Sequence, residues 1–234
     1  MPSGKDTNNP EPTFEPLSNG LQLGARVYKI LLKSIVSGQV APGAQLRPDT
    51  IARQLEISTT PVREAMHRLE SDGLAVKHSY QGWFVREHTK EEIRELYELR
   101  VALERFGVEL ACQRMTDDEI GWLRRHQSTG EVALAAGDMD AYRNYNRDLH
   151  AAIIRAARNS YLSGVMGQLQ SQSEMLIART VRIIGRPLRA IKEHQQLIEL
   201  IAARDAAEAG RLMSQHISSA LEDIISLREN LAEK

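Results

Sequence analysis

The segment "ISTTPVREAMHRLESDGLAVKHSYQGWFV", residues 57–85, constrains the fold of this chain more than any other segment. Its apolar residues repeat at the spacing of one helix face and then stop at a glycine, as Val62, Ala65, Met66, Leu69 and Gly73. Residues 74–77 and 83–86 follow as two short strands, joined by a loop that contains Gln81-Gly82. The pattern predicts a short amphipathic helix followed directly by a small hairpin.

Two further helices are expected before this segment. The first has apolar residues at helical spacing and ends at a glycine, as Val27, Ile30, Leu31, Ile35 and Gly38. Asp49 is in position to cap a short second helix, and Thr60 to cap the third, with Pro61 at its first position. Three helices and a hairpin in this order predict a winged helix-turn-helix.

Such a domain suggests contact with DNA, because its reading helix fits a major groove about 12 Å wide. The N-terminus of that helix attracts phosphates through its free N–H groups and its dipole. Ser58, Thr59 and Thr60 lie at this N-terminus with small hydroxyl groups. These three residues are therefore candidate DNA contacts.

Other candidate contacts lie further along the same segment. Arg63 and His67 are four residues apart, on the helix face away from the apolar stripe. Gln81 lies at the tip of the wing, and Gly82 allows the backbone to approach a duplex closely. The alternative is a protein-interaction module, in which Arg63 and His67 belong to an ordinary solvated face.

Composition limits the class of protein. The chain has 234 residues, of which 42% are apolar and 26% charged, enough for a buried core. No apolar run is long enough for a membrane span, the N-terminus lacks a signal-peptide pattern, and the single Cys112 fits a reducing cytoplasm. Residues 21–88 carry nine Lys/Arg against six Asp/Glu, and residues 89–234 carry 20 against 22. A mildly basic front half is compatible with phosphate contact.

The second half is helical throughout, so we expect a mainly α protein. Helices are predicted at 90–114, 117–136, 139–158, 161–184, 187–203 and 205–231. This organisation predicts a flexible arm (1–19), a winged helix-turn-helix domain (20–88) and an all-helical effector-binding and dimerisation domain (89–234). Residues 86–92 are the expected hinge.

Three histidines lie on apolar helix faces of the second half. They are His150, one turn after Asn146, and His194 and His216 on two later helices. A single buried histidine is usually a core residue, but three in one helical bundle all need polar partners. One shared cation satisfies all three, and imidazoles with an oxygen donor suit Zn²⁺ or Ni²⁺.

Arg100 lies on the same helix face as Ile93, Leu96 and Tyr97. It has two interpretations. It either forms an internal pair with Glu104 or faces a cavity, where its forked guanidinium binds the carboxylate of an effector.

The segment "ISTTPVREAMHRLESDGLAV", followed by "QGWFV", resembles the GntR superfamily of bacterial transcription regulators, over about 20–88. The resemblance implies that Ser58, Thr60, Arg63 and Gly82 contact DNA. Two positions depart from the family pattern, because Thr59 replaces an arginine and Asp49 stands where another arginine is usual. Arg47 lies two residues before Asp49 and is also a candidate contact. These departures suggest an altered operator preference or weaker, less salt-dependent binding.

Residues 90–230 contain the segments "EEIRELYELRVALERFGVELA", "NRDLHAAIIRAARNSYL" and "EHQQLIELIAARDAAEAGRLMSQHI". Through these segments this half resembles the FCD domain, the all-helical effector domain of the FadR branch of this superfamily. The resemblance implies a metal bound by Asn146, His150, His194 and His216, and an effector that is often a small organic acid. Asparagine in place of the usual aspartate keeps an oxygen ligand but removes a charge.

The leading interpretation is a ligand-responsive repressor that binds a pseudo-palindromic operator as a homodimer. Two alternatives stay open at this point. A metal-dependent hydrolase-like enzyme would use the three histidines with an open position for water, although only Glu193 is a candidate base. A DNA-binding protein with a structural metal would need no effector.

Overall fold

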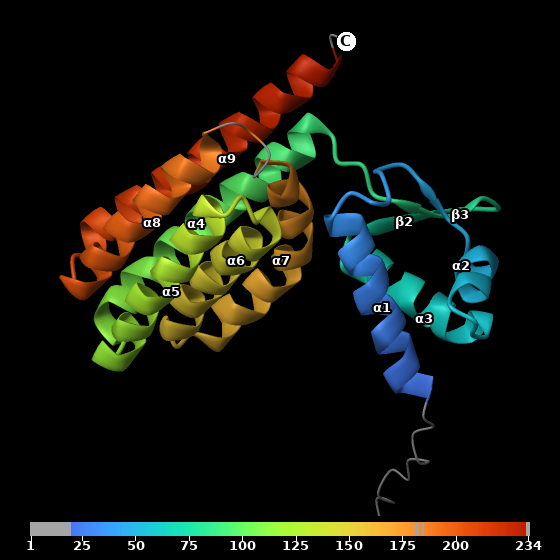
Figure 1. Cartoon of the computed structure of the whole chain (residues 1–234), viewed down its shortest axis with the longest axis horizontal. Helices are drawn as coiled ribbons and strands as arrows, with labels where there is room; N and C mark the ends of the chain where they lie inside the picture. Colours follow the sequence, from blue (N-terminus) through green and yellow to red (C-terminus); the bar gives the residue numbers. More distant parts are fainter. Residues whose placement is uncertain (1–19, 181–182, 184, 233–234) are drawn as a thin grey trace, which may run out of the picture.

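A computed structural model describes residues 20–180, 183 and 185–232 as two groups of elements that follow each other along the chain (Figure 1). The winged domain comprises α1 (Gly20–Val36), β1 (Gln45–Leu46), α2 (Pro48–Gln54), α3 (Thr59–Ser71), β2 (Ala75–His78) and β3 (Gly82–Val85). The helical domain comprises α4 (Lys90–Arg114), α5 (Asp117–Ala135), α6 (Met139–Ala156), α7 (Ser160–Thr180), α8 (Arg186–Ala202) and α9 (Ala206–Ala232). The predicted arm lies outside the described residues, as do 181, 182 and 184 of the predicted helix 161–184.

The winged helix-turn-helix is confirmed, with one strand that the sequence did not predict. The three strands are antiparallel in the order β1-β3-β2, with Gln45 opposite Phe84 and Lys77 opposite Trp83. Strand β1 has only two residues, too short for an alternation to be recognised. The predicted apolar stripe of α3 is buried in the core of this domain, against Trp83 and Val85 of the wing.

The predicted helix caps of the winged domain were wrong. Helix α3 begins at Thr59 after Ser58, whose backbone is extended (φ −70°, ψ 162°), so Thr60 is not the cap. Pro61 is the third residue of the helix, where its missing N–H costs nothing because the first four N–H groups have no helical partner. Helix α2 is preceded by Arg47 and begins at Pro48, so Asp49 lies within its first turn.

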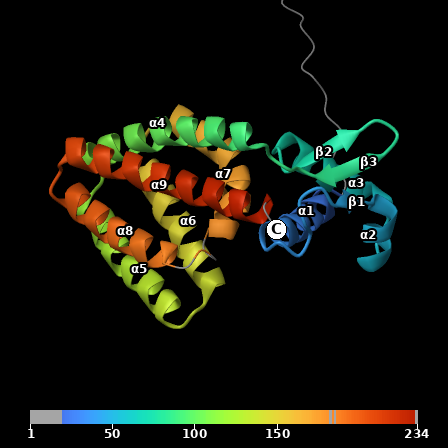
Figure 2. The same ribbon diagram turned by 90° about the horizontal axis from the view of Figure 1, so that it is seen from above.

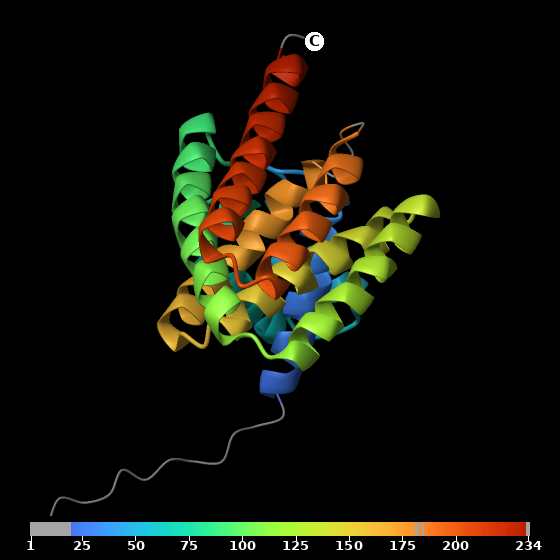
Figure 3. The same cartoon turned by 90° about the vertical axis from the view of Figure 1, so that its left-hand side faces the viewer.

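The helical domain has its helices close to the predicted positions. Helix α9 lies between α4 and α8, and α5 packs on the other side of α8 (Figure 3). Thr89 and Thr116 form capping boxes with Glu92 and Glu119. Because α4 starts at Lys90, residues 90–92 of the predicted hinge belong to this helix. None of the described helices is long and apolar enough to cross a membrane.

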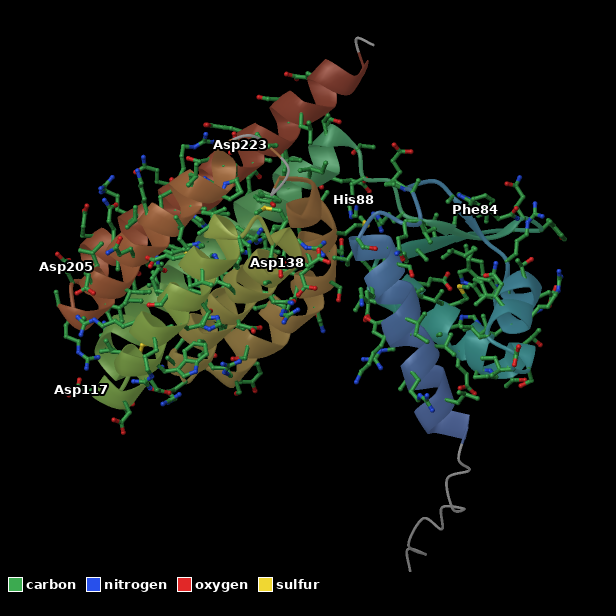
Figure 4. All side chains as sticks on the ribbon, viewed as in Figure 1. Phe84, His88, Asp117, Asp138, Asp205 and Asp223 are labelled. Atoms are coloured by element: carbon green, nitrogen blue, oxygen red, sulfur yellow. The ribbon has the colours of Figure 1, made fainter. Side chains whose placement is uncertain are left out.

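The two domains meet along α1 and α7, and α1 is the winged-domain helix next to the helical domain (Figures 1 and 2). Met175 of α7 is buried in the core of the winged domain. His88, just before α4, lies at this junction (Figure 4), and its Nε2 is 3.2 Å from Gln172 Oε1 of α7. The backbone carbonyl of Val36 accepts a hydrogen bond of 3.3 Å from Arg143 of α6. Helix α7 therefore contacts both the winged domain and the interior of the helical domain.

Candidate metal, ligand and DNA sites

The three histidines converge, as the sequence predicted. His150 lies on α6, His194 on α8 and His216 on α9, and one ring nitrogen from each lies within 4.8 Å of the others. His194 is fully buried, His216 is 5% exposed, and the side chain of His150 is 11% exposed. The neighbouring apolar residues of α6, α8 and α9 form the core of the helical domain, which holds the three rings at this point.

Each imidazole has a partner on its Nδ1 atom. Glu104 Oε2 lies 2.5 Å from Nδ1 of His150, and Glu193 Oε2 lies 2.6 Å from Nδ1 of His216. Nδ1 of His194 lies 3.1 Å from the hydroxyl of Tyr145. Hydrogen bonds of this kind orient metal-binding histidines in proteins, because they fix the tautomer and the ring direction.

The partners also determine where the protons lie. Tyr145 donates its single hydroxyl proton to Gln127 Oε1 at 2.5 Å, so its oxygen accepts from Nδ1 of His194. The carboxylate of Glu193 likewise accepts from Nδ1 of His216. The Nε2 atoms of His194 and His216 therefore both present lone pairs, and they lie 3.3 Å apart. Two lone pairs facing each other at this distance favour a shared cation.

Burial keeps His194 and His216 in the form that binds metals. Desolvation lowers the pKa of His194 well below its usual value, and His216 and His150 lower it further. Desolvation, followed by the electrostatic effect of the neighbouring His150, also lowers the pKa of His216. Both rings are thus neutral at pH 7, and a neutral imidazole is the state that ligates a divalent ion.

Asn146 and Arg100 lie beside this cluster. Both line a small cavity that also borders His150 and His216. Arg100 donates to Glu104 Oε1 from Nε at 2.9 Å and from Nη2 at 2.7 Å, so the internal pair considered above is present. Its Nη1 is buried without an acceptor among the described residues, although the guanidinium lies over the Tyr97 ring at 4.8 Å. Arg100 therefore has both features: a structural partner and a donor to spare.

Glu104 completes the arrangement. Burial alone would raise its pKa, but the charge of Arg100 and the hydrogen bonds from His150 and Arg100 outweigh burial and hold the pKa well below its usual range. Glu104 is therefore an anion that joins Arg100 to His150. The sequence indicates Glu104 only as a partner of Arg100, because the contact of Glu104 with α6 depends on how two distant helices pack.

A larger cavity of about 590 Å³ opens next to these residues. Arg100, Glu104, Asn146 and His150 line one side of it. A volume of this size is typical of small-molecule sites. The cavity and the histidine cluster share a wall, so a molecule in the cavity lies next to the candidate metal site.

On the winged domain, the N-terminus of α3 is open to solvent. Ser58 and Thr60 are exposed, Thr59 is partly exposed, and the side chain of Ser58 does not cap the helix. The first N–H groups of α3 are therefore available to a phosphate. Arg63 is exposed one turn further along, on the face predicted for it.

The other candidate DNA contacts lie near the wing. Gln45 donates to the Gln81 carbonyl at 2.7 Å and accepts from Arg47 at 2.9 Å, which connects Arg47 to the wing tip. Gly82 has a φ of 89°, a conformation that favours glycine. His67 is exposed but packs edge-on against Trp83, with ring centroids 5.1 Å apart. Gln45 was not predicted from the sequence, because nothing in the local pattern placed it beside the wing.

Comparison with known proteins matches both halves of the chain. The family model of the FCD domain matches residues 95–219, more than half of the chain, and that of bacterial regulatory proteins, gntR family, matches residues 23–85. The Nta operon transcriptional regulator of Aminobacter aminovorans is 31% identical over 197 residues, covering 82% of this chain and 90% of that protein. The Gluconate operon transcriptional repressor of Bacillus subtilis is 28% identical over 213 residues, covering 89% of this chain and 86% of that protein.

Solved structures share the fold. The structure of McbR/YncC from E. coli superposes with a TM-score of 0.77 at 24% identity, covering 88% of this chain and 98% of that one. A GntR transcriptional regulator from Rhodococcus sp. RHA1 superposes with a TM-score of 0.73 at 23% identity, with the same coverage.

Proposed function

This chain belongs to the gntR family of bacterial regulatory proteins and carries an FCD domain, so it is a DNA-binding transcription regulator rather than an enzyme. On that premise we propose that its helical domain senses a carboxylate through a divalent metal ion and thereby controls its binding to DNA. The three convergent, oriented imidazoles are the observation that carries this proposal.

The proposed metal ligands are His150, His194 and His216, with Asn146 as the oxygen donor. The site suits such an ion, because three imidazole nitrogen donors, each oriented by a partner on its Nδ1 atom, match the preferences of Zn²⁺ or Ni²⁺. When bound, the ion supplies a positive centre that attracts a carboxylate. Arg100 supplies the second attraction, because its spare donor can approach the same group.

Helix α7 is the proposed route from ligand to DNA. It lines the large cavity through Ser173 and Ile177, while Gln172 and Met175 contact the winged domain. A shift of this helix on ligand binding would therefore move the winged domain. A coupling free energy of about 1–3 kcal/mol would change operator affinity about 5–150-fold.

We propose a homodimer that reads two half-sites of a pseudo-palindromic operator in the cytoplasm. Ser58, Thr59, Thr60 and Arg63 would contact DNA through α3. The other proposed DNA contacts are Arg47, His67, Gln81 and Gly82. Leu99 and Phe106 support self-association, since they lie seven residues apart on α4 and are 44% and 46% exposed. Repression, with release on ligand binding, is supported by the names of relatives such as the Gluconate operon transcriptional repressor.

The test measures bound metal and ligand-induced stabilisation. We expect purified protein, or chelated protein reloaded with Zn²⁺ or Ni²⁺, to bind about one equivalent per chain. A thermal-shift screen of small carboxylates should then give a stabilising compound, whose effect follows from mass action. The same compound should stabilise the chelated protein much less.

Two outcomes would contradict the proposal. If metal removal unfolds the protein and no carboxylate stabilises the loaded form, the metal is structural. If a carboxylate stabilises loaded and chelated protein equally, the metal has no part in sensing.

A further inference from the structure

The large cavity has a second wall that belongs to the winged domain. Lys29, Leu32, Lys33 and Val36 of α1 line the cavity together with His150 of the helical domain. A ligand that fills the cavity would therefore contact the DNA-binding domain directly, in addition to any contact transmitted through α7.

The charge of this cavity is strongly positive. Six cationic side chains line it against three carboxylates, an excess of three positive charges, and the cations are Lys29, Lys33, Arg100, Arg143, Arg147 and Arg155. A bound divalent ion would add two more. Such a site favours a ligand with more than one negative charge.

Three of these cations form no ion pair among the described residues, Lys29 and Lys33 on α1 and Arg155 on α6. Arg143 is paired with Asp140 at 2.6 Å and Arg147 with Asp148 at 3.0 Å. Lys29 and Lys33 form no ion pair within the part of the chain that the structure describes. These two ammonium groups lie one helical turn apart, so both can approach one anionic group.

Apolar side chains line this cavity together with the charged ones. They include Leu32 and Val36 of α1, and Ile154, Met166 and Ile177 of the helical domain. A ligand with two anionic ends would therefore place an apolar body here, where burial of its hydrocarbon surface is favourable.

We propose that the effector is an elongated dicarboxylate with an apolar spacer. One carboxylate is held at the histidine cluster and Arg100, and the other by Lys29 and Lys33 of α1. This inference rests on the proposed function, since it places the first carboxylate at the proposed metal. It makes α1 part of the ligand site, so the ligand connects the two domains itself.

The test compares two series of probes on the metal-loaded full-length protein by calorimetry. One series is linear dicarboxylates of increasing chain length, and the other is the monocarboxylates of the same lengths. We expect a range of lengths at which the dicarboxylate binds about tenfold more tightly than its monocarboxylate, because two partly exposed ion pairs are worth about this factor.

The variant K29Q/K33Q should remove that advantage and leave monocarboxylate affinity within about twofold. Lys192→Gln provides the matched control, because Lys192 is exposed on α8 and does not line the cavity. The metal content of all three proteins should be equal.

Three results would overturn the inference. The first is that dicarboxylates show no advantage at any length, and the second is that K29Q/K33Q weakens both series equally. In either case monocarboxylate binding would leave the proposed function intact. If neither series binds the loaded protein at all, the proposed carboxylate site is wrong, and this inference is wrong with it.

Discussion

At the scale of single residues, the histidine cluster depends on atoms that do not touch the proposed metal. His216 is held by Glu193, and His194 by Tyr145, which is itself held by Gln127. An imidazole that lacks such a partner rotates and loses basicity. The partners are therefore expected to affect metal affinity almost as much as the ligands do.

Replacing Glu193 by alanine should weaken metal binding about 10–100-fold, because Nδ1 of His216 loses its acceptor. The measurement is competition for metal with a coloured chelator. Glu199→Ala is the control: Glu199 lies on the same helix but pairs with Arg124 at the surface, 2.7 Å away. Equal metal affinity in E193A and the parent would show that the hydrogen bond does not orient a ligand.

The metal-free protein should lose stability as the pH falls below about 6.5. His194 and His216 have lowered pKa values in the folded state, mainly through burial, so the unfolded chain binds more protons in this range. Stability is complete above the unfolded pKa and falls towards the folded one, by about 1.4 kcal/mol per pH unit for each ring.

Urea unfolding of the chelated protein between pH 7 and pH 5 measures this loss. The range lies above the titration of carboxylates such as Glu104, whose pKa is lowered. The double variant H194Q/H216Q should show a smaller change of the free energy of unfolding with pH. A free energy of unfolding that does not change across this range would contradict the account of two neutral buried rings.

At the scale of the elements, α5 supports the cluster through a close contact with α6. Gly130 of α5 faces Tyr145, and a Cβ atom at Gly130 would lie 2.5 Å from Cδ1 of the tyrosine ring. The ring is buried and bound to both Gln127 and His194, so it cannot move freely. The glycine is therefore needed for the helix packing that positions His194.

Gly130→Ala should lower the free energy of unfolding by about 1–3 kcal/mol, through overpacking, and weaken metal binding. Gly121→Ala on the same helix is the control. Its Cβ would meet only the flexible Arg125 side chain, at 3.3 Å, so it should be neutral or stabilising by up to about 1 kcal/mol. Denaturant titration measures both, and equal effects would refute the role assigned to the Gly130 contact.

Helix α7 should carry part of the signal between domains. Gln172→Ala removes the contact with His88 at the junction, so it should reduce the ligand-induced change in DNA affinity several-fold. Ligand and metal affinity should change little. Gln168→Ala, one turn earlier and exposed, is the control. The ligand response is measured by fluorescence anisotropy with labelled DNA. A full response in Q172A would show that this contact does not transmit the signal between the domains.

At the scale of the whole molecule, helical periodicity was enough to predict the helices and to place the three histidines on inward faces. It could not give the partners of those rings, because Glu104, Tyr145 and Glu193 meet them only through tertiary packing. Local pattern also could not predict that α1 lines the cavity, since this depends on how the two domains dock. The predicted cap at Thr60 was wrong because Ser58, Thr59 and Thr60 are all residue types suited to the position before a helix, and Ser58 takes it.

The central claim is that metal-dependent ligand binding in the helical domain controls the affinity of the winged domain for DNA. The most direct test is to select a duplex from a random pool and titrate it with loaded protein, with and without the best-binding carboxylate. The account predicts that the carboxylate weakens duplex binding about 5–150-fold in the parent protein. It predicts no such change in the chelated protein or in His194→Gln. An equal change in all three proteins would contradict it.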